Sequence, residues 1–302
     1  MQARVSENIK GKDELIRLAL VTLVAGGHLL IEDIPGVGKS TLARALAEVT
    51  GGSYTRVQFT SDLLPADLLG INVWRASEER FELRKGPLFA NVVLADEVNR
   101  APPRTQSALL EAMAEGTVSI DGVTHELPAP FAVLATQNPQ EHHGTYPLPE
   151  SQRDRFLLRV SMGYAAPEVE TALLCDPSSA KLRSLEAVLE RPEELVELQA
   201  AAREVHLHPD LARYAQKIVQ ATREDPNIRL GVSTRGALAW VAAARAHALV
   251  SGRLQVNLDD LQDLAVPALS HRILPTQNAV GDGSTVADEL LRDVIARTHV
   301  PT

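Results

Sequence analysis

The chain has 302 residues, of which 45% are apolar and 23% charged, a composition typical of a globular protein with room for two domains. Its formal net charge of −9 argues against a general nucleic-acid binder, because phosphate backbones demand basic surface. The single cysteine, Cys175, excludes a disulfide or a cysteine-based metal site within one chain, and we expect it to be a small buried or half-buried residue.

The apolar residues show no membrane or export signal. No apolar run approaches ~18 residues, the length that suggests a membrane span. The N-terminal stretch from Met1 to Leu15 contains no apolar signal core. We therefore expect a cytoplasmic protein without a membrane span.

The N-terminal half alternates predicted helices with short apolar strands. Apolar positions recur at helical spacing over residues 13–25, and Gly26 and Gly27 end this helix. Continuous apolar runs predict strands buried on both faces, and these runs are 28–32, 54–59, 91–96, 131–137 and 156–162. Helical patterns lie at 39–49, 103–115 and 149–155. This alternation predicts a doubly wound α/β domain with its ligand at the carboxyl ends of the strands.

Two insertions interrupt the alternation, over residues 61–88 and 117–127. In the second, Asp121 and Gly122 stand between alternating runs, which predicts a tight β-hairpin. The sheet does not need this hairpin, so it is either a surface that contacts another molecule or a solvated edge extension. Trp74 in the first insertion is either a contact residue or a buried anchor.

The pattern of the chain changes after Gly163. From residue 192 to residue 273 the sequence has the periodicity of amphipathic helices, and residues 286–297 form a last helix. We expect an α/β core over residues 1–165, a linker over 166–190 and a separate helical domain over 191–302.

The run IEDIPGVGKST, residues 31–41, predicts a strand, a glycine turn and the start of a helix. Such a turn aims backbone N–H groups at one point at the positive end of a helix dipole, which suits the polyphosphate of a nucleotide such as ATP. Lys39 would reach the β- and γ-phosphates, and the Ser40 hydroxyl would contact bound Mg2+. The residues expected to bind the nucleotide are Pro35, Gly36, Val37, Gly38, Lys39, Ser40 and Thr41.

One position departs from the usual P-loop pattern G-x-x-x-x-G-K-[ST], because Asp33 occupies the first glycine position. A carboxylate that faced a polyphosphate would be repelled, so this side chain must turn away or find a hydrogen-bond donor. The glycines that let the backbone approach the phosphates, Gly36 and Gly38, are present.

An acidic pair ends the apolar strand in the run VVLADEVNR. Asp96 lies at the predicted strand tip, where it would hold Mg2+ through its water shell, opposite Ser40. Glu97 would accept a proton from the water that attacks the γ-phosphate, or orient that water. Carboxylates at a buried strand end are costly unless a cation pairs with them, which favours this interpretation over two solvated loop residues.

Taken together, these runs resemble the MoxR family of AAA+ ATPases. The resemblance is carried by IPGVGKS, LADEVNRAPPRTQSALLEAMAEGTVSIDG and ATQNPQEHHGTYPLPESQRDRF, with DLLPADLLG, GPLFA and GVSTRGALAW. It runs from about residue 9 to residue 274, and an aspartate at the first glycine position is common in that family.

The resemblance implies further roles for single residues. Asn138 matches the sensor-1 residue, which holds the attacking water. Arg155 matches the arginine finger, which acts on the γ-phosphate of a neighbouring subunit, although Arg153 lies two residues away and could share or take that role. Arg235 matches sensor 2, and Ser233 before it belongs to a predicted helix N-cap.

The resemblance also implies a fold, an assembly and an activity. The implied fold is an αβα P-loop core with a five-stranded parallel sheet of order 5-1-4-3-2, followed by an all-helical lid. The two insertions match the helix-2 insert and the pre-sensor-1 hairpin, which line or cap a ring pore. The family implies ATP hydrolysis in a homo-oligomeric ring, a hexamer. The ring would remodel client complexes during maturation or insertion of a metal or cofactor, with partners that carry von Willebrand A domains.

Two other functions belong to different classes. A DNA-dependent AAA+ motor or helicase loader would need basic hairpins that face DNA, whereas the hairpin here offers Asp121 and Glu126, so nucleic acid is not the expected partner. A nucleotide-gated binding protein that barely hydrolyses ATP is opposed by the intact Lys39, Asp96 and Glu97.

Overall fold

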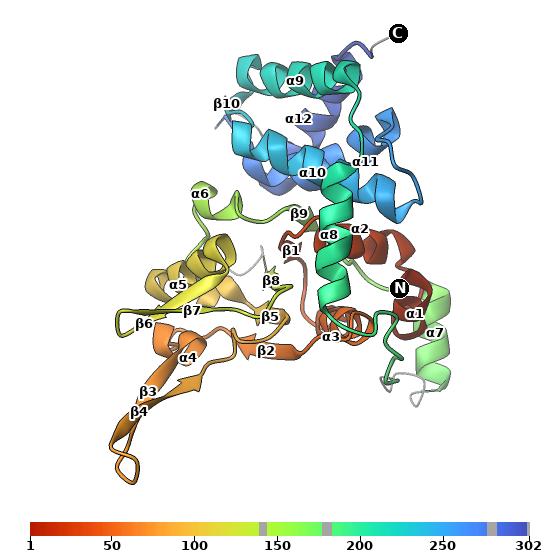
Figure 1. The fold of residues 1–302 in the computed structure, drawn as a ribbon. Coiled ribbons are helices and arrows are strands. Elements are labelled where there is room, and N and C mark those ends of the chain that lie inside the picture. Colours follow the sequence, from red (N-terminus) through yellow and green to blue (C-terminus); the bar gives the residue numbers. More distant parts are fainter. Residues whose placement is uncertain (139–143, 177–182, 277–282, 301–302) are drawn as a thin grey trace. The chain divides into compact units, whose positions relative to one another are not determined.

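In the computed structural model the chain forms two compact units (Figure 1). The structure describes residues 1–138, 144–176, 183–276 and 283–300. The first unit comprises Met1–Leu20, His28–Leu148 and Val160–Val196, and the second comprises Val21–Gly27, Pro149–Arg159 and Glu197–Thr302. The domain ranges predicted from the sequence, 1–165 and 191–302 with a linker between them, stay a prediction.

A five-stranded parallel sheet organises the N-terminal half of the chain. Its strands are β1 (Leu29–Glu32), β2 (Tyr54–Gln58), β5 (Val92–Asp96), β8 (Ala132–Gln137) and β9 (Leu158–Val160). They lie in the order β2-β5-β8-β1-β9, which confirms the predicted order 5-1-4-3-2 read from the other edge. The central strands β1, β5 and β8 consist almost wholly of buried residues, as expected of a parallel sheet covered on both faces.

The helices of this half begin and end at the residues that break the helical pattern. α2 (Asp13–Val24) ends before Gly26, and α3 (Lys39–Val49) begins directly after Gly38. α5 (Pro103–Glu115) has proline in its first turn and ends at Gly116, whose φ of 65° is left-handed. α3 packs on β2 and β5, and α1 (Gln2–Asn8), which packs on α3, was not predicted.

Cys175 ends α7 (Pro167–Cys175) and is exposed, so the expectation that it is buried or half-buried is wrong. Nearly every α7 residue whose burial the structure describes faces solvent, and only Val169 is half-buried. The position of an isolated short helix, rather than the residue type, decides this exposure.

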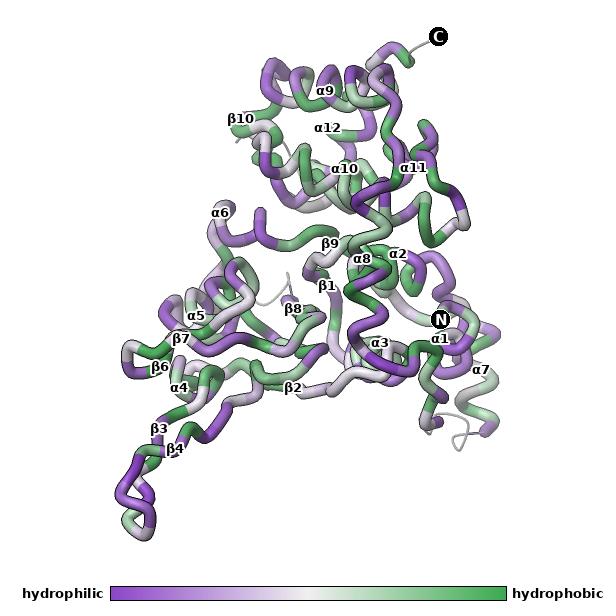
Figure 2. Tube along the Cα trace, viewed as in Figure 1, coloured by the Kyte–Doolittle hydropathy of each residue, from purple (hydrophilic) through white to green (hydrophobic). Residues whose placement is uncertain are grey.

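Both insertions form β-hairpins. The first consists of α4 (Pro65–Leu69), β3 (Gly70–Arg75) and β4 (Arg80–Lys85), and the second of β6 (Thr117–Ile120) and β7 (Val123–Glu126). The Asp121-Gly122 turn joins β6 to β7, as predicted. In Figure 2 the β3–β4 hairpin is largely hydrophilic, with hydrophobic residues interspersed.

Trp74 stands on the first hairpin with 51% of its surface exposed. Its ring meets that of Phe81 on the opposite strand edge-on, with 5.1 Å between the ring centroids, and Phe81 is also exposed. Trp74 is therefore not a buried anchor. Nδ2 of Asn72 donates to the Asp121 carboxylate over 2.9 Å, which links the two hairpins.

Helices dominate the C-terminal part, as predicted. They are α8 (Glu193–Glu204), α9 (Pro209–Glu224), α10 (Thr234–Val250), α11 (Leu258–Leu269), the 3-10 helix η3 (Ser270–Arg272) and α12 (Gly283–Arg297). A short antiparallel pair that was not predicted, β10 (Ile228–Leu230) with β11 (Leu274–Pro275), adds to them. Trp240 is fully buried, and its indole N–H donates to the carbonyl of Leu261 over 2.9 Å, which fixes α10 against α11.

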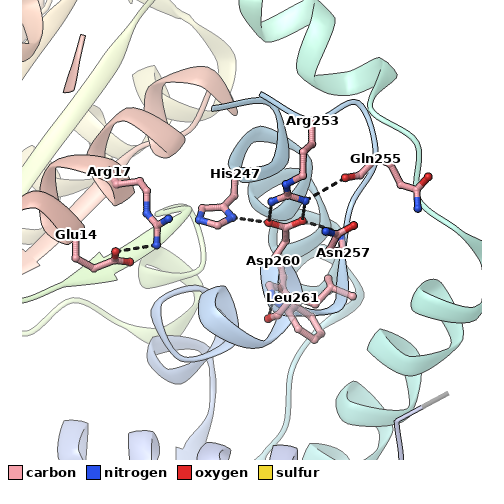
Figure 3. A network of polar contacts seen from close by, with 9 residues as sticks. Glu14, Arg17, His247, Arg253, Gln255, Asn257, Asp260 and Leu261 are labelled. Atoms are coloured by element: carbon pink, nitrogen blue, oxygen red, sulfur yellow. Dashed lines mark hydrogen bonds and ion pairs between the residues drawn. The ribbon is translucent and has the colours of Figure 1, made fainter. Parts of the chain in front are cut away.

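A buried carboxylate joins these two helices (Figure 3). Asp260 has no exposed surface and accepts hydrogen bonds from Nδ1 of His247 on α10 over 2.6 Å and from both terminal nitrogens of Arg253. It also accepts from the backbone N–H of Asn257, the N-cap of α11, over 2.7 Å.

Among the helices of the described residues, none combines the length and the apolar character that a membrane span requires.

Candidate nucleotide site

The segment between β1 and α3 forms the predicted P-loop. Gly36 and Gly38 have φ values of 85° and 100°, in the left-handed region that favours glycine. Gly38 is the N-cap of α3, and no side chain caps this end, so the first N–H groups of the helix remain available to an anion. A Cβ added to Gly36 would meet no atom within 4 Å, so the front of the loop has room for phosphates.

Lys39 is half-buried at the start of α3. Its Nζ donates to the carbonyl oxygen of Asp33 over 3.0 Å. Burial lowers the pKa of Lys39, and the negative charges of Asp96, Asp33 and Glu97 oppose that shift. The P-loop follows β1 and the acidic pair lies at the end of β5, so both are at the carboxyl end of the same parallel sheet. The roles of Lys39 and of the acidic pair in nucleotide binding stay a prediction.

Two residues that the sequence analysis missed hold Asp96. One carboxylate oxygen accepts from Oγ1 of Thr136 at the end of β8, and the other from Nη2 of Arg56 on β2, both over 2.6 Å. The hydrogen bond to Asp96 raises the pKa of Arg56, against the effect of burial. The signal for both is positional, because each stands within three residues of the carboxyl end of a predicted parallel strand.

Glu97 adopts a left-handed backbone with φ of 57°, which is uncommon for a residue other than glycine and clusters at functional sites. Its N–H donates to Oγ1 of Thr136 over 2.9 Å. Its carboxylate accepts from Nε2 of Gln58 over 2.7 Å and from Nη1 of Arg100 over 3.0 Å. Neighbouring strands therefore fix both the backbone and the carboxylate of Glu97.

Asn138 follows β8 and is buried, next to the start of the P-loop. The N–H of Asp33 donates to the carbonyl of Gln137 over 3.1 Å, and Glu32 pairs with Gln137 in the sheet register. These contacts place Asn138 at the same sheet edge as the P-loop.

The Asp33 carboxylate turns toward donors, which was one of the two outcomes expected of it. Ser161, Met162 and Gly163, just after β9, supply these donors. The departure from the P-loop pattern is therefore compensated within the fold.

Arg153 and Arg155 belong to the second unit, where both are half-buried. The chain next to Arg155 is held by Arg272, whose Nε donates to the Asp154 carboxylate and whose Nη2 donates to the carbonyl of Phe156, both over 2.7 Å. Burial lowers the pKa of Arg272, and Asp154 opposes this shift. These hydrogen bonds from Arg272 hold the chain on either side of Arg155 in place.

Arg235 lies in the first turn of α10 and is exposed. Ser233 is the N-cap, as predicted, and its hydroxyl accepts from the N–H of Gly236 over 3.0 Å. Arg235 belongs to the second unit, like Arg155, and the approach of these arginines to a nucleotide stays a prediction.

The described part of the chain brings together no group of three or more His, Cys, Asp or Glu side chains arranged to hold a metal ion. Magnesium in phosphate sites takes only one or two carboxylates from the protein, with water and substrate phosphates as the other ligands. The hydroxyl of Ser40 and the carboxylate of Asp96 are the hard oxygen donors that suit such an ion.

The sheet order, the glycine turn and the acidic strand tip define a P-loop nucleotide-binding protein of the AAA type. Residues 28–158 match the family described as "ATPase family associated with various cellular activities (AAA)", and residues 220–294 match the "AAA lid domain". These matches confirm the predicted fold class, a P-loop α/β core with a helical lid.

Similar proteins point to one branch of this class. The chain is 45% identical over 292 residues to the uncharacterized protein YeaC of Bacillus subtilis, which covers 96% of this chain and 91% of the relative. It is 42% identical over 291 residues to Chaperone MoxR1 of Mycobacterium tuberculosis, and the match covers 92% of this chain and 76% of that relative. It is 33% identical over 296 residues to Protein MoxR of Paracoccus denitrificans, and the match covers 90% of this chain and 87% of that relative.

A solved structure agrees with this placement. The crystal structure of a provisionally assigned ATPase from Cytophaga hutchinsonii superposes with a TM-score of 0.90 at 33% identity and covers 99% of this chain and 93% of that one. The chain belongs to the MoxR family of AAA+ ATPases, as the resemblance implied.

Proposed function

We propose that this protein hydrolyses ATP and uses the reaction to remodel partner protein complexes. The observation that supports the proposal is that the glycine turn before Lys39, after β1, and the acidic pair Asp96 and Glu97, at the end of β5, lie at the carboxyl end of one parallel sheet. In a parallel α/β fold, this edge is where ligands bind. A cation and two carboxylates beside an open helix N-terminus are suited to phosphoryl transfer.

The P-loop residues from Pro35 to Thr41 bind the triphosphate through backbone N–H groups and the Lys39 ammonium group. Ser40 and Asp96 would hold Mg2+, which, when bound, supplies positive charge against the phosphate oxygens. Arg56 pairs with the Asp96 carboxylate, and the Arg56 side chain is half exposed, so it can turn to solvent and release the carboxylate.

Glu97 accepts the proton of the attacking water, and Asn138 holds that water against the γ-phosphate. The contacts of the Glu97 carboxylate with Gln58 and Arg100 keep it at the strand tip. A general base needs such fixed geometry within hydrogen-bond reach of the proton that it takes.

The proposed assembly is a ring, a hexamer, in which Arg155 reaches the γ-phosphate of the neighbouring subunit and Arg235 binds phosphate from the lid. The exposed pair Trp74 and Phe81 supports contact with a client protein, because a chain with only 4% aromatic residues leaves two of them in solvent on one hairpin. Maturation of client complexes, partners with von Willebrand A domains and a cytoplasmic location remain parts of the proposal. The DNA-dependent alternative is not favoured, since Asp121 and the net charge of −9 oppose it.

Binding of ATP by the Lys39→Ala variant tests this proposal. Calorimetry of the purified wild type with Mg-ATP is expected to show saturable binding, and Lys39→Ala is expected to abolish it, since the ammonium group contacts the phosphates directly. Lys217→Ala, which removes an exposed lysine on α9, is the matched control and should bind like the wild type. Unchanged affinity in Lys39→Ala, or a wild type indifferent to ATP, contradicts the proposal.

A further inference from the structure

Asp33 stands where the P-loop pattern has glycine, and its carboxylate makes a set of contacts that a glycine cannot make. We propose that Asp33 is a positioning residue: it clasps the P-loop to the chain segment that follows β9 and so sets the geometry of nucleotide binding. The inference rests on the proposed ATPase function, whose site it concerns.

Asp33 is only 7% exposed, and both oxygens of its carboxylate accept hydrogen bonds. Its Oδ2 atom accepts from the hydroxyl of Ser161 over 3.0 Å, from the N–H of Gly163 over 2.6 Å and from the N–H of Met162. Its Oδ1 atom accepts from the N–H of Ile34 over 2.8 Å. Because Asp33 follows β1 and Ser161 follows β9, the clasp joins the carboxyl ends of two neighbouring strands.

The same segment is held from its other side by Lys12. Nζ of Lys12 donates to the carbonyl of Met162 over 2.6 Å and to that of Tyr164 over 2.5 Å. The Asp33 carboxylate therefore accepts hydrogen bonds from N–H groups of this segment, and the Lys12 ammonium group donates hydrogen bonds to its carbonyls. A Cβ on Gly38 would lie 3.7 Å from Cε of Met162, which shows that the clasped segment rests against the P-loop.

The clasp resolves the electrostatic conflict at this position. A free carboxylate beside a polyphosphate would be repelled, but this one already receives four hydrogen bonds, which hold a charged group strongly. The backbone carbonyl of Asp33 in turn accepts from Nζ of Lys39 over 3.0 Å. Displacement of Asp33 would therefore disturb both the start of the loop and the lysine that reaches the phosphates.

Asp33→Gly is the decisive variant, because it restores the usual P-loop residue while it deletes the clasp. If the carboxylate were merely tolerated, this change would leave ATP binding equal or better, since a negative charge is removed. We expect the opposite, a loss of Mg-ATP affinity of about tenfold or more in calorimetry and a matching rise in KM, with a smaller change in kcat. Amide hydrogen exchange over residues 34–38 should accelerate in the same variant.

Two further variants separate positioning from general stability. Ser161→Ala removes one donor from outside the loop and should weaken ATP binding several-fold without changing the P-loop sequence. Asp225→Asn alters another buried carboxylate, paired with Arg297 in the second unit, and should leave ATP affinity unchanged even though it destabilises the fold.

The outcomes are distinguishable from failure of the proposed function. If the wild-type protein binds no ATP, the proposed ATPase function itself is contradicted. A wild type that binds ATP, with Asp33→Gly equal to it, overturns only the clasp. If Asp33→Gly does not fold by circular dichroism, Ser161→Ala decides, and unchanged affinity in that variant overturns the inference.

Discussion

Asp260 offers a quantitative test of what holds the helical unit together. We expect the isosteric substitution Asp260→Asn to destabilise this unit strongly. An amide cannot accept from His247, from both nitrogens of Arg253 and from the N–H of Asn257, because its NH2 group must face at least one of these donors. The change leaves buried donors unpaired and removes the negative charge opposite a guanidinium.

The magnitude follows from burial. Removal of one partner of a buried ion pair costs about 3–5 kcal/mol. Asp260 has no exposed surface, whereas the Arg253 side chain is 33% exposed and can regain water, so the low end, about 3 kcal/mol, is appropriate. For a unit of this size, that loss corresponds to a fall of roughly 10 °C in Tm.

Thermal and urea unfolding followed by circular dichroism would measure this loss. Asp259→Asn is the matched control, because Asp259 is the exposed neighbour in the first turn of α11 and should change stability by less than about 0.5 kcal/mol. A loss below about 1 kcal/mol in Asp260→Asn, or equal losses in both variants, would refute the reasoning.

The same network predicts a pH dependence. Burial raises the pKa of Asp260, but the hydrogen bonds from Arg253, His247 and the Asn257 N–H outweigh it and hold the pKa far below its ordinary value of 3.8. Because the folded-state pKa is depressed, the stabilisation is present above that ordinary value and is lost as the pH falls toward the folded-state pKa. Asp260→Asn should therefore flatten the acid limb of the stability curve.

Two predictions concern catalysis. Glu97→Gln keeps the shape of the side chain, so the variant should bind ATP like the wild type. It should release phosphate at least ~100-fold more slowly, the usual scale for a lost general base. A turnover equal to that of the wild type would contradict the role of Glu97. Arg155→Ala should lose roughly 10³-fold in turnover, the scale of a missing arginine finger, with Arg153→Ala as the comparison that decides which arginine acts. Mixing Glu97→Gln with Arg155→Ala protein should restore part of the activity, and no recovery in assemblies shown to be mixed would count against shared sites.

Local sequence was enough for the elements that carry the site. The glycine turn before Lys39 and the apolar run before Asp96 each encode their structure within about ten residues, because periodicity and positive-φ glycines are local properties. The strand order came from the family resemblance rather than from spacing, because many sheet orders share the same alternation of strands and helices. The short pair β10–β11 was missed, because two-residue and three-residue strands leave no periodic signal.

Contacts between distant residues needed the fold. Three of the four donors to the Asp33 carboxylate lie about 130 positions away in the chain, and Arg56 and Thr136 each lie 40 positions from Asp96, so no local pattern pairs them. The sequence showed that Trp74 had two possible roles and that Asp33 needed a donor, since both statements follow from residue chemistry. Only tertiary structure could decide that Trp74 faces solvent and that the chain after β9 supplies the donors, because burial and hydrogen-bond partners depend on which strand ends the fold places side by side.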